Sequence, residues 1–236
     1  MALPKLDTSK YELEVPSTGE KVLYRPYLVK EEKILMLAME SEDTSQMIQA
    51  TKDVIRACTD NQIDVDQLTM FDLEFIFITL RSKSSGESAN VGIKCEECGH
   101  KNEVPIHLDK IYISEINKDN KLIKLTDKIQ IEMKYPDLNS IIAIEKDKKS
   151  NEVEKTFRLI AKSIDSIYHE ENVFSASEQS EKELMDFIDQ MNSSQFEKIK
   201  NFVEQMPQSQ IDVEFICESC NHENNLNIKG LQNFFR

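Results

Sequence analysis

The sequence contains no tryptophan and little of the two residues that build tight turns, since its 236 residues include only 5 glycines and 6 prolines. Phosphate-binding loops of the GxGxxG or GxxxxGK type need closely spaced glycines, which no segment supplies. Apolar runs are also short, because none approaches the roughly 18 residues that a membrane span requires. Residues 1–5 have no apolar core of signal-peptide length. These absences exclude nucleotide binding through a glycine-rich loop and predict a protein without a membrane, located in the cytoplasm or assembled there.

Basic residues are in deficit, because 29 lysines and arginines face 43 aspartates and glutamates, for a net charge of −14. Proteins that bind nucleic acid through its phosphates need a basic face, so the net charge disfavours nucleic acid as a partner. Hydrophobic residues make up 39% of the chain and charged residues 31%, a balance typical of a folded protein with a core. The length allows one large or two small domains.

The N-terminal part, residues 1–86, reads as a hairpin followed by helices. Alternating apolar residues over 11–15 and 22–24 flank a Pro-Ser-Thr-Gly turn, which predicts a β-hairpin. Helical spacing predicts a helix over 29–40 and another over 44–58. We expect the first helix to bury one side, formed by Ile34, Leu35, Leu37 and Ala38.

Residues 68–80 are apolar almost all round, as a central buried helix requires. Thr69 and Asp72 form a predicted capping box at its start. The polar residues 81–86 that follow read as a loop.

From residue 87 to 135 the apolar residues alternate with polar ones, which predicts strands around 91–93, 104–108 and 129–135. Residues 136–208 return to helical spacing and read as a helical insert. One predicted helix in it carries Val153, Phe157, Ile160, Ile164 and Ile167, and others cover 184–191 and 195–206. The charge-rich residues 145–155 predict a solvated helix end and loop.

One short repeat stands out, because residues 91–106 (VGIKCEECGHKNEVPI) match residues 213–228 (VEFICESCNHENNLNI). Each copy is a strand, a Cys-x-x-Cys turn, a residue that tolerates left-handed backbone (Gly99 or Asn221) and a returning strand. Such a knuckle directs two thiolates at one point, and tetrahedral zinc takes four ligands. The two knuckles therefore predict one structural zinc per chain, held by Cys95, Cys98, Cys217 and Cys220.

This ligand set predicts a split zinc ribbon, because 118 residues separate Cys98 from Cys217. Residues 209–236 then close the β module that residues 87–135 begin. The predicted fold is α+β, with a helical N-terminal part and a long helical insert around a small antiparallel β module.

Other roles for these residues have less support in the sequence. A redox dithiol usually opens a helix, whereas strands flank both motifs here, and disulfides are rare in the cytosol. For His100 and His222 two readings stay open. Either one of them replaces a cysteine as a ligand or donates a hydrogen bond to a thiolate, or they are exposed turn residues. Cys58 reads as a small buried hydrophobe. No catalytic set is present, neither Ser/His/Asp nor HExxH, so the sequence predicts no enzyme.

Two segments, 23–35 (LYRPYLVKEEKIL) and 71–84 (FDLEFIFITLRSKS), together with the first knuckle, resemble the baseplate hub assembly proteins of T-even-like contractile-tailed phages. The resemblance implies a late virion-assembly protein of the tail hub, a structural protein or an assembly factor, without catalytic residues. Its implied partners are other baseplate hub and tail proteins. Its implied locations are the host cytoplasm during assembly and the virion tail baseplate.

The alternative is a zinc-ribbon regulator that associates with nucleic acid, which the net charge disfavours. The apolar residues 231–236 (LQNFFR) either dock on the chain's own core or anchor a partner. The sequence shows no self-complementary seam and so does not indicate an oligomeric state.

Overall fold

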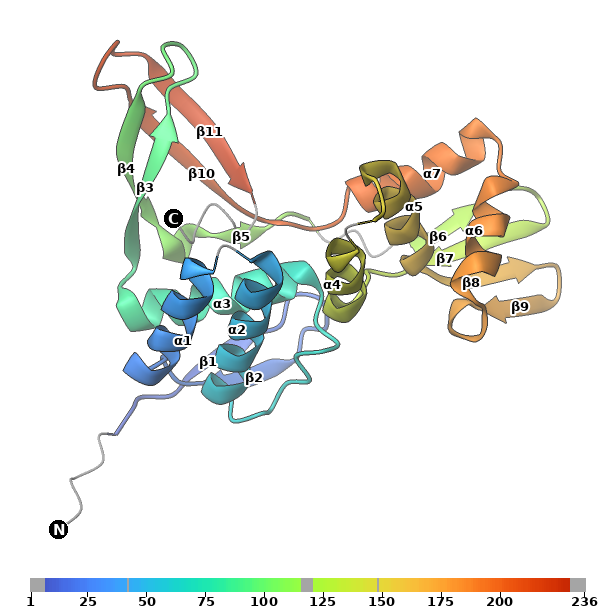
Figure 1. The fold of residues 1–236 in the computed structure, drawn as a ribbon, viewed down its shortest axis with the longest axis horizontal. Helices are drawn as coiled ribbons and strands as arrows, with labels where there is room; N and C mark the ends of the chain where they lie inside the picture. Colours follow the sequence, from blue (N-terminus) through green and yellow to red (C-terminus); the bar gives the residue numbers. More distant parts are fainter. Residues whose placement is uncertain (1–6, 42, 116–120, 148, 230–236) are drawn as a thin grey trace. The chain divides into compact units, whose positions relative to one another are not determined.

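The computed structural model describes residues 7–41, 43–115, 121–147 and 149–229 (Figure 1). The chain forms two compact units. Unit 1 comprises Met1–Ser114 and Gln208–Arg236, and unit 2 comprises Glu115–Pro207. Helices and small antiparallel sheets occur together, which confirms the predicted α+β class. The apolar tip predicted at 231–236 lies outside the described residues.

Unit 1 begins with the predicted hairpin, formed by β1 (Tyr11–Glu14) and β2 (Lys21–Tyr24) in antiparallel pairing. The turn closes where the Gly19 N–H donates to the Val15 carbonyl at 2.8 Å. Three helices follow, namely α1 (Val29–Glu40), α2 (Thr44–Cys58) and α3 (Met70–Ser85). The first two begin and end where the sequence predicted them.

The buried side of α1 differs from the prediction. Leu35 and Ala38 are buried, but Ile34 is 43% exposed and Leu37 is 67% exposed. The third buried residue of the helix is Glu31. At 100° per residue, positions 31, 35 and 38 share one stripe, and an ion pair with Arg25 holds Glu31 inward. The charged residue thus rotates the helix relative to its hydrophobic pattern and leaves apolar residues on the outside.

Helix α3 confirms the predicted buried helix and its capping box. The Thr69 hydroxyl accepts from the Asp72 N–H at 3.2 Å, and the Asp72 carboxylate accepts from the Thr69 N–H at 3.0 Å. The predicted loop at 81–86 is wrong, because the helix continues to Ser85. A tertiary contact accounts for the extension, since the Tyr27 N–H donates to the Ser84 hydroxyl at 2.9 Å.

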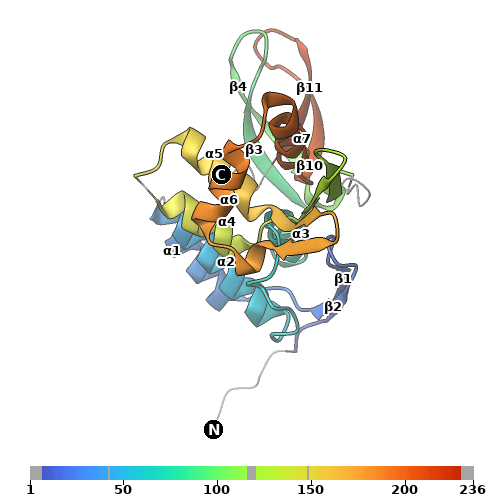
Figure 2. The same ribbon diagram turned by 90° about the vertical axis from the view of Figure 1, so that its right-hand side faces the viewer.

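Two further hairpins of unit 1 extend side by side away from the helices (Figures 1 and 2). One consists of β3 (Ser88–Lys94) and β4 (Lys101–His107). The other consists of β10 (Ser209–Ile216) and β11 (Glu223–Lys229), and β10 also pairs with the short β5 (Tyr112–Ile113). The turns at their ends carry the two Cys-x-x-Cys motifs.

Unit 2 is inserted between two points of unit 1 that hydrogen-bond to each other. The chain leaves at Ser114, whose N–H donates to the Gln208 carbonyl at 3.0 Å. It returns at Gln208, whose N–H donates to the Ser114 hydroxyl at 2.9 Å. The 93 residues between them therefore start and finish at one place.

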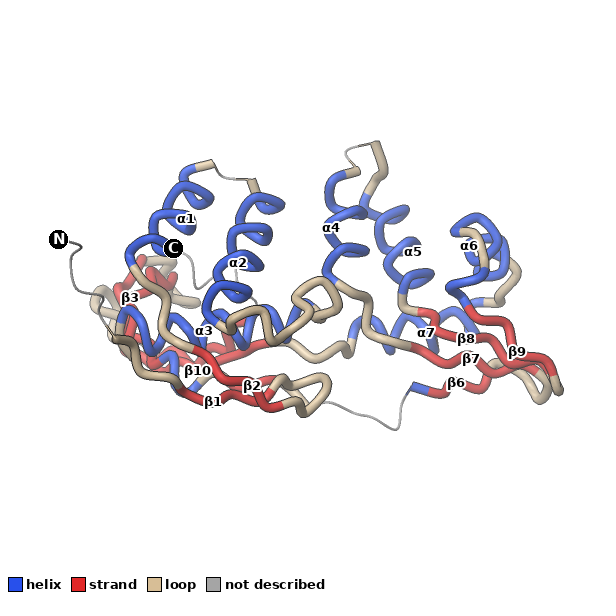
Figure 3. Tube along the Cα trace, turned by 90° about the horizontal axis from the view of Figure 1, so that it is seen from below, coloured by secondary structure: helices blue, strands red, loops and turns tan. Residues whose placement is uncertain are grey.

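Unit 2 contains a four-stranded antiparallel sheet in the order β6 (Leu122–Lys124), β7 (Ile129–Met133), β8 (Ile164–His169) and β9 (Asn172–Ser175). Its helices are α4 (Leu138–Lys146), α5 (Glu152–Lys162), α6 (Glu181–Asp189) and α7 (Ser193–Glu204). Helices α5 and α6 lie over one face of the sheet (Figure 3). The core joins α5, α6 and α7 to that face through Ile131, Met133, Ile160, Ile164, Leu184, Ile188, Ile199 and Phe202.

The prediction of an all-helical run through Ile167 is wrong. The helix ends at Lys162, where the Ser163 hydroxyl and N–H both donate to the Leu159 carbonyl. The Ser163 carbonyl then accepts from the Lys134 N–H, which starts the pairing with β7. Ile164 and Ile167 lie on β8, where Ile167 is opposite Ile131. Their three-residue spacing suits a helix, but β-branched side chains favour the sheet that the neighbouring strand provides.

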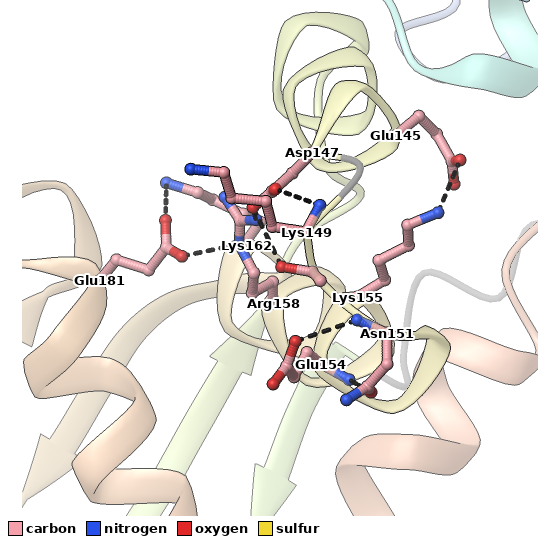
Figure 4. Close-up of polar contacts among 10 residues, drawn as sticks. Glu145, Asp147, Lys149, Asn151, Glu154, Lys155, Arg158, Lys162 and Glu181 are labelled. Atoms are coloured by element: carbon pink, nitrogen blue, oxygen red, sulfur yellow. Dashed lines mark hydrogen bonds and ion pairs between the residues drawn. The ribbon is translucent and has the colours of Figure 1, made fainter.

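Of the charge-rich residues 145–155, the described ones form the end of α4, as predicted, and the start of α5 with the residues before it. Their charges are paired in part (Figure 4). Arg158 donates to Asp147 and to Glu181, each at 2.8 Å. Asn151 and Glu154 form the capping box of α5. These contacts therefore hold Asp147, at the end of α4, against α5 and stabilise the start of α5.

Candidate metal centre

The two cysteine turns have the same backbone conformation. In the first, the Cys95 N–H donates to the His100 carbonyl at 2.8 Å, and Gly99 has φ +70°. In the second, the Cys217 N–H donates to the His222 carbonyl at 2.9 Å, and Asn221 has φ +59°. Glycine and asparagine are the residues that adopt this left-handed conformation most readily. The predicted knuckles are confirmed, including their left-handed residue.

The four cysteine sulfur atoms lie within 4.8 Å of one another. Cys95 Sγ is 3.7 Å from Cys220 Sγ, and Cys98 Sγ is 3.6 Å from Cys217 Sγ. Sulfur atoms about 2.3 Å from a central zinc form a regular tetrahedron with edges of about 3.8 Å. The cluster thus has the spacing of a tetrathiolate site, and it is able to hold a metal ion.

Burial divides the four thiols into two kinds. Cys95 and Cys217, the first cysteine of each knuckle, are buried, whereas Cys98 and Cys220 are exposed. The two short sulfur contacts each join a buried thiol of one knuckle to an exposed thiol of the other. The cluster is therefore formed between the knuckles, with neither knuckle complete by itself.

Backbone N–H groups, burial and neighbouring thiols shift the pKa values of Cys95, Cys217 and Cys220. The Cys98 N–H lowers the pKa of Cys95. Burial raises the pKa of Cys217, but the Cys220 N–H and the neighbouring thiols bring it down to about 6. The His222 N–H lowers the pKa of Cys220, whereas the surrounding thiols and burial raise it to about 12. A metal ion bound among thiols favours their thiolate form, which is the form that ligates it.

Two buried asparagines connect the knuckles, and the sequence analysis missed them. Asn102 Oδ1 accepts from the Glu218 N–H at 3.0 Å, and Asn224 Oδ1 accepts from the Glu96 N–H at 3.0 Å. Both are 2% exposed. The repeat contained the signal, since Asn102 and Asn224 occupy the same position in its two copies.

Neither knuckle histidine joins the cluster. The side chains of His100 and His222 are both exposed. These residues contribute to the turns through their backbone carbonyls, which accept from the Cys95 and Cys217 N–H groups. Among the described residues, the group of ligand atoms around the site consists of the four cysteines.

The family model for the T4 bacteriophage base plate protein matches residues 8–236. The chain belongs to this family. No curated protein and no solved structure matches it. Membership in the baseplate family identifies the chain as a T4-like phage baseplate protein, a structural component of the phage tail, and implies contacts with other baseplate proteins.

The remaining cysteine of this baseplate protein behaves as predicted. Cys58 is 1% exposed on α2, and burial raises the pKa of its thiol to about 11. It is absent from the sulfur cluster. Across the described parts of the baseplate protein, no helix combines the length and the apolar character needed to cross a bilayer.

Proposed function

We propose that this baseplate protein is a non-catalytic structural component or assembly factor of the baseplate hub, with one structural zinc held by Cys95, Cys98, Cys217 and Cys220. The observation that supports it most is the convergence of four thiols from two chain segments more than 100 residues apart, in a member of the baseplate family. A site closed by four thiolates keeps no position for a substrate. The zinc would supply cohesion between the hairpins.

The hub assignment rests on the resemblance of residues 23–35 and 71–84 to hub assembly proteins. We place the protein in the host cytoplasm during assembly and in the tail baseplate afterwards. Contacts with other proteins are supported by the outer side of α1, where five large apolar residues are at least 42% exposed, namely Val29, Ile34, Met36, Leu37 and Met39. Several such residues on one short helix are typical of a contact surface.

Native mass spectrometry of the purified chain should show one zinc ion per polypeptide. The physical reason is that four thiolates satisfy the tetrahedral preference of zinc. The same spectrum gives the oligomer mass. A chain that carries no metal while all its cysteines are reduced would contradict the zinc proposal and leave the family assignment untouched.

The hub assignment predicts that the protein co-sediments with baseplate hub intermediates from infected cells. We would detect it by antibody across a sucrose gradient, and in purified virions. The control is an infection with a phage that cannot form hub intermediates, where the protein should stay at the top of the gradient. Sedimentation that is the same in both infections would argue against a hub role.

A further inference from the structure

Asn102 and Asn224 use both ends of their side-chain amides. Within its own knuckle, the Asn102 Nδ2 group donates to the His100 carbonyl at 3.0 Å, while its Oδ1 accepts from Glu218 in the other knuckle. Asn224 repeats this arrangement, with its Nδ2 group on the His222 carbonyl at 3.0 Å. The pair thus forms two reciprocal bridges between hairpins that are far apart in the sequence.

The bridges end next to the buried sulfur atoms. Glu96 directly follows Cys95, and Glu218 directly follows Cys217. Each asparagine therefore holds the backbone beside the buried cysteine of the opposite knuckle. Through the His carbonyls, which also accept from the Cys95 and Cys217 N–H groups, it holds its own turn as well. Both turns are fixed relative to each other by bonds that involve no metal.

Asparagine has the chemistry that this position uses. The side chain needs one donor and one acceptor on a short stem. An ionised aspartate lacks the donor and would add negative charge beside the thiols. A glutamine carries the same groups on a longer stem, which this buried space between the turns would have to accommodate.

We infer that Asn102 and Asn224 are positioning residues of the metal centre, which lock the two knuckles together and set the four sulfur atoms in place. The inference rests on the proposed metal site. Mutation of groups that orient metal ligands typically lowers the affinity for the metal by about 10- to 100-fold. Preorganised ligands also spare the metal the entropic cost of bringing the two hairpins together.

The test is a Co²⁺ titration of the full-length reduced chain, with a competing chelator to give the dissociation constant. We expect Asn102→Ala and Asn224→Ala each to weaken Co²⁺ binding about 10- to 100-fold and to change the ligand-field absorption bands, which report the geometry of the sulfur ligands. Asn225→Ala is the matched control, since Asn225 neighbours Asn224 on β11 but is exposed. It should bind like wild type.

Amide hydrogen exchange of the Co²⁺-loaded chains supplies a second readout that a general loss of stability would not produce. Asn102→Ala should speed exchange at the Glu218 N–H more than at the Glu96 N–H, and Asn224→Ala should do the reverse. Wild-type affinity, spectrum and exchange in both variants would overturn the inference. A wild-type chain that takes up no Co²⁺ would instead overturn the proposed metal site itself.

Discussion

Replacement of Cys217 by serine should release the metal and weaken the attachment of the β3–β4 hairpin to the β10–β11 hairpin, leaving the asparagine bridges between them. Cys217 is fully buried, and its sulfur atom belongs to the cluster. Apparent binding free energies of structural zinc are roughly 10–16 kcal/mol, as large as the total stability of most domains. Even a loss of about 4 kcal/mol would lower the melting temperature by roughly 10 °C. Thermal unfolding followed by circular dichroism, with zinc counted by native mass spectrometry, measures both effects.

The fifth cysteine provides the control for this variant. Cys58→Ala removes a buried thiol of unit 1 that is absent from the cluster, so the chain should keep its zinc and lose only the stability of one small core group. Unit 2 has its own core. Its amide exchange should therefore be as slow in the Cys217 variant as in the wild type. A Cys217→Ser chain that binds zinc and melts like wild type would refute the idea that the metal joins the hairpins.

Replacement of Arg25 by alanine should destabilise unit 1 by about 3–5 kcal/mol, because it removes the mostly buried cation that pairs with the buried Glu31 carboxylate. Arg25 Nη2 lies 2.8 Å from Glu31 Oε1, and the two side chains are 13% and 3% exposed. Arg25 also donates to the Ala57 carbonyl at 3.2 Å, so it ties the start of α1 to the end of α2. Urea unfolding monitored by circular dichroism gives the change in free energy.

Lys30 offers a matched comparison, since its Nζ lies 3.3 Å from the same Glu31 oxygen but its side chain is 70% exposed. Exposed pairs contribute roughly 0–1 kcal/mol, so Lys30→Ala should be nearly neutral. Equal costs for the two variants would show that burial of the Arg25 pair is unimportant.

The same pair implies a dependence of stability on pH. Burial raises the pKa of Glu31, but the hydrogen bond and charge of Arg25, the Leu28 N–H and the hydrogen bond from Lys30 together lower it below its ordinary value of 4.5. The stabilisation is therefore complete above pH 4.5 and is lost as the pH falls through the lower pKa of the folded state. In Arg25→Ala this acid-induced loss should disappear.

The cysteine cluster was the part of the molecule that the sequence predicted best, because a repeated Cys-x-x-Cys turn specifies both the thiols and the local backbone. Helix α3 was also predictable, since its apolar residues cover its whole circumference. The orientation of α1 was not, because a buried ion pair between Arg25 and Glu31 overrides the apolar pattern. Strand β8 was missed for a related reason, since the pairing of Ile167 with Ile131 is a long-range contact that local spacing does not encode.

The bridging asparagines show a different limit. Their polar side chains read as ordinary surface residues in a strand, and only the facing knuckle supplies the backbone N–H groups that they bond. A short polar residue at the same position in both copies of a repeat is a usable sign of such a contact.

The insertion of unit 2 between Ser114 and Gln208 sets the order of events during synthesis. The second knuckle follows the first by 122 residues, the difference between positions 217 and 95. At about 5–20 residues per second, the ribosome delivers it roughly 6–24 s after the first. During that interval the nascent chain presents only two of the four thiols of the cluster, Cys95 and Cys98, and unit 2 has time to fold before the hairpins meet. Closure of the cysteine cluster therefore waits for the second knuckle and follows the synthesis of unit 2.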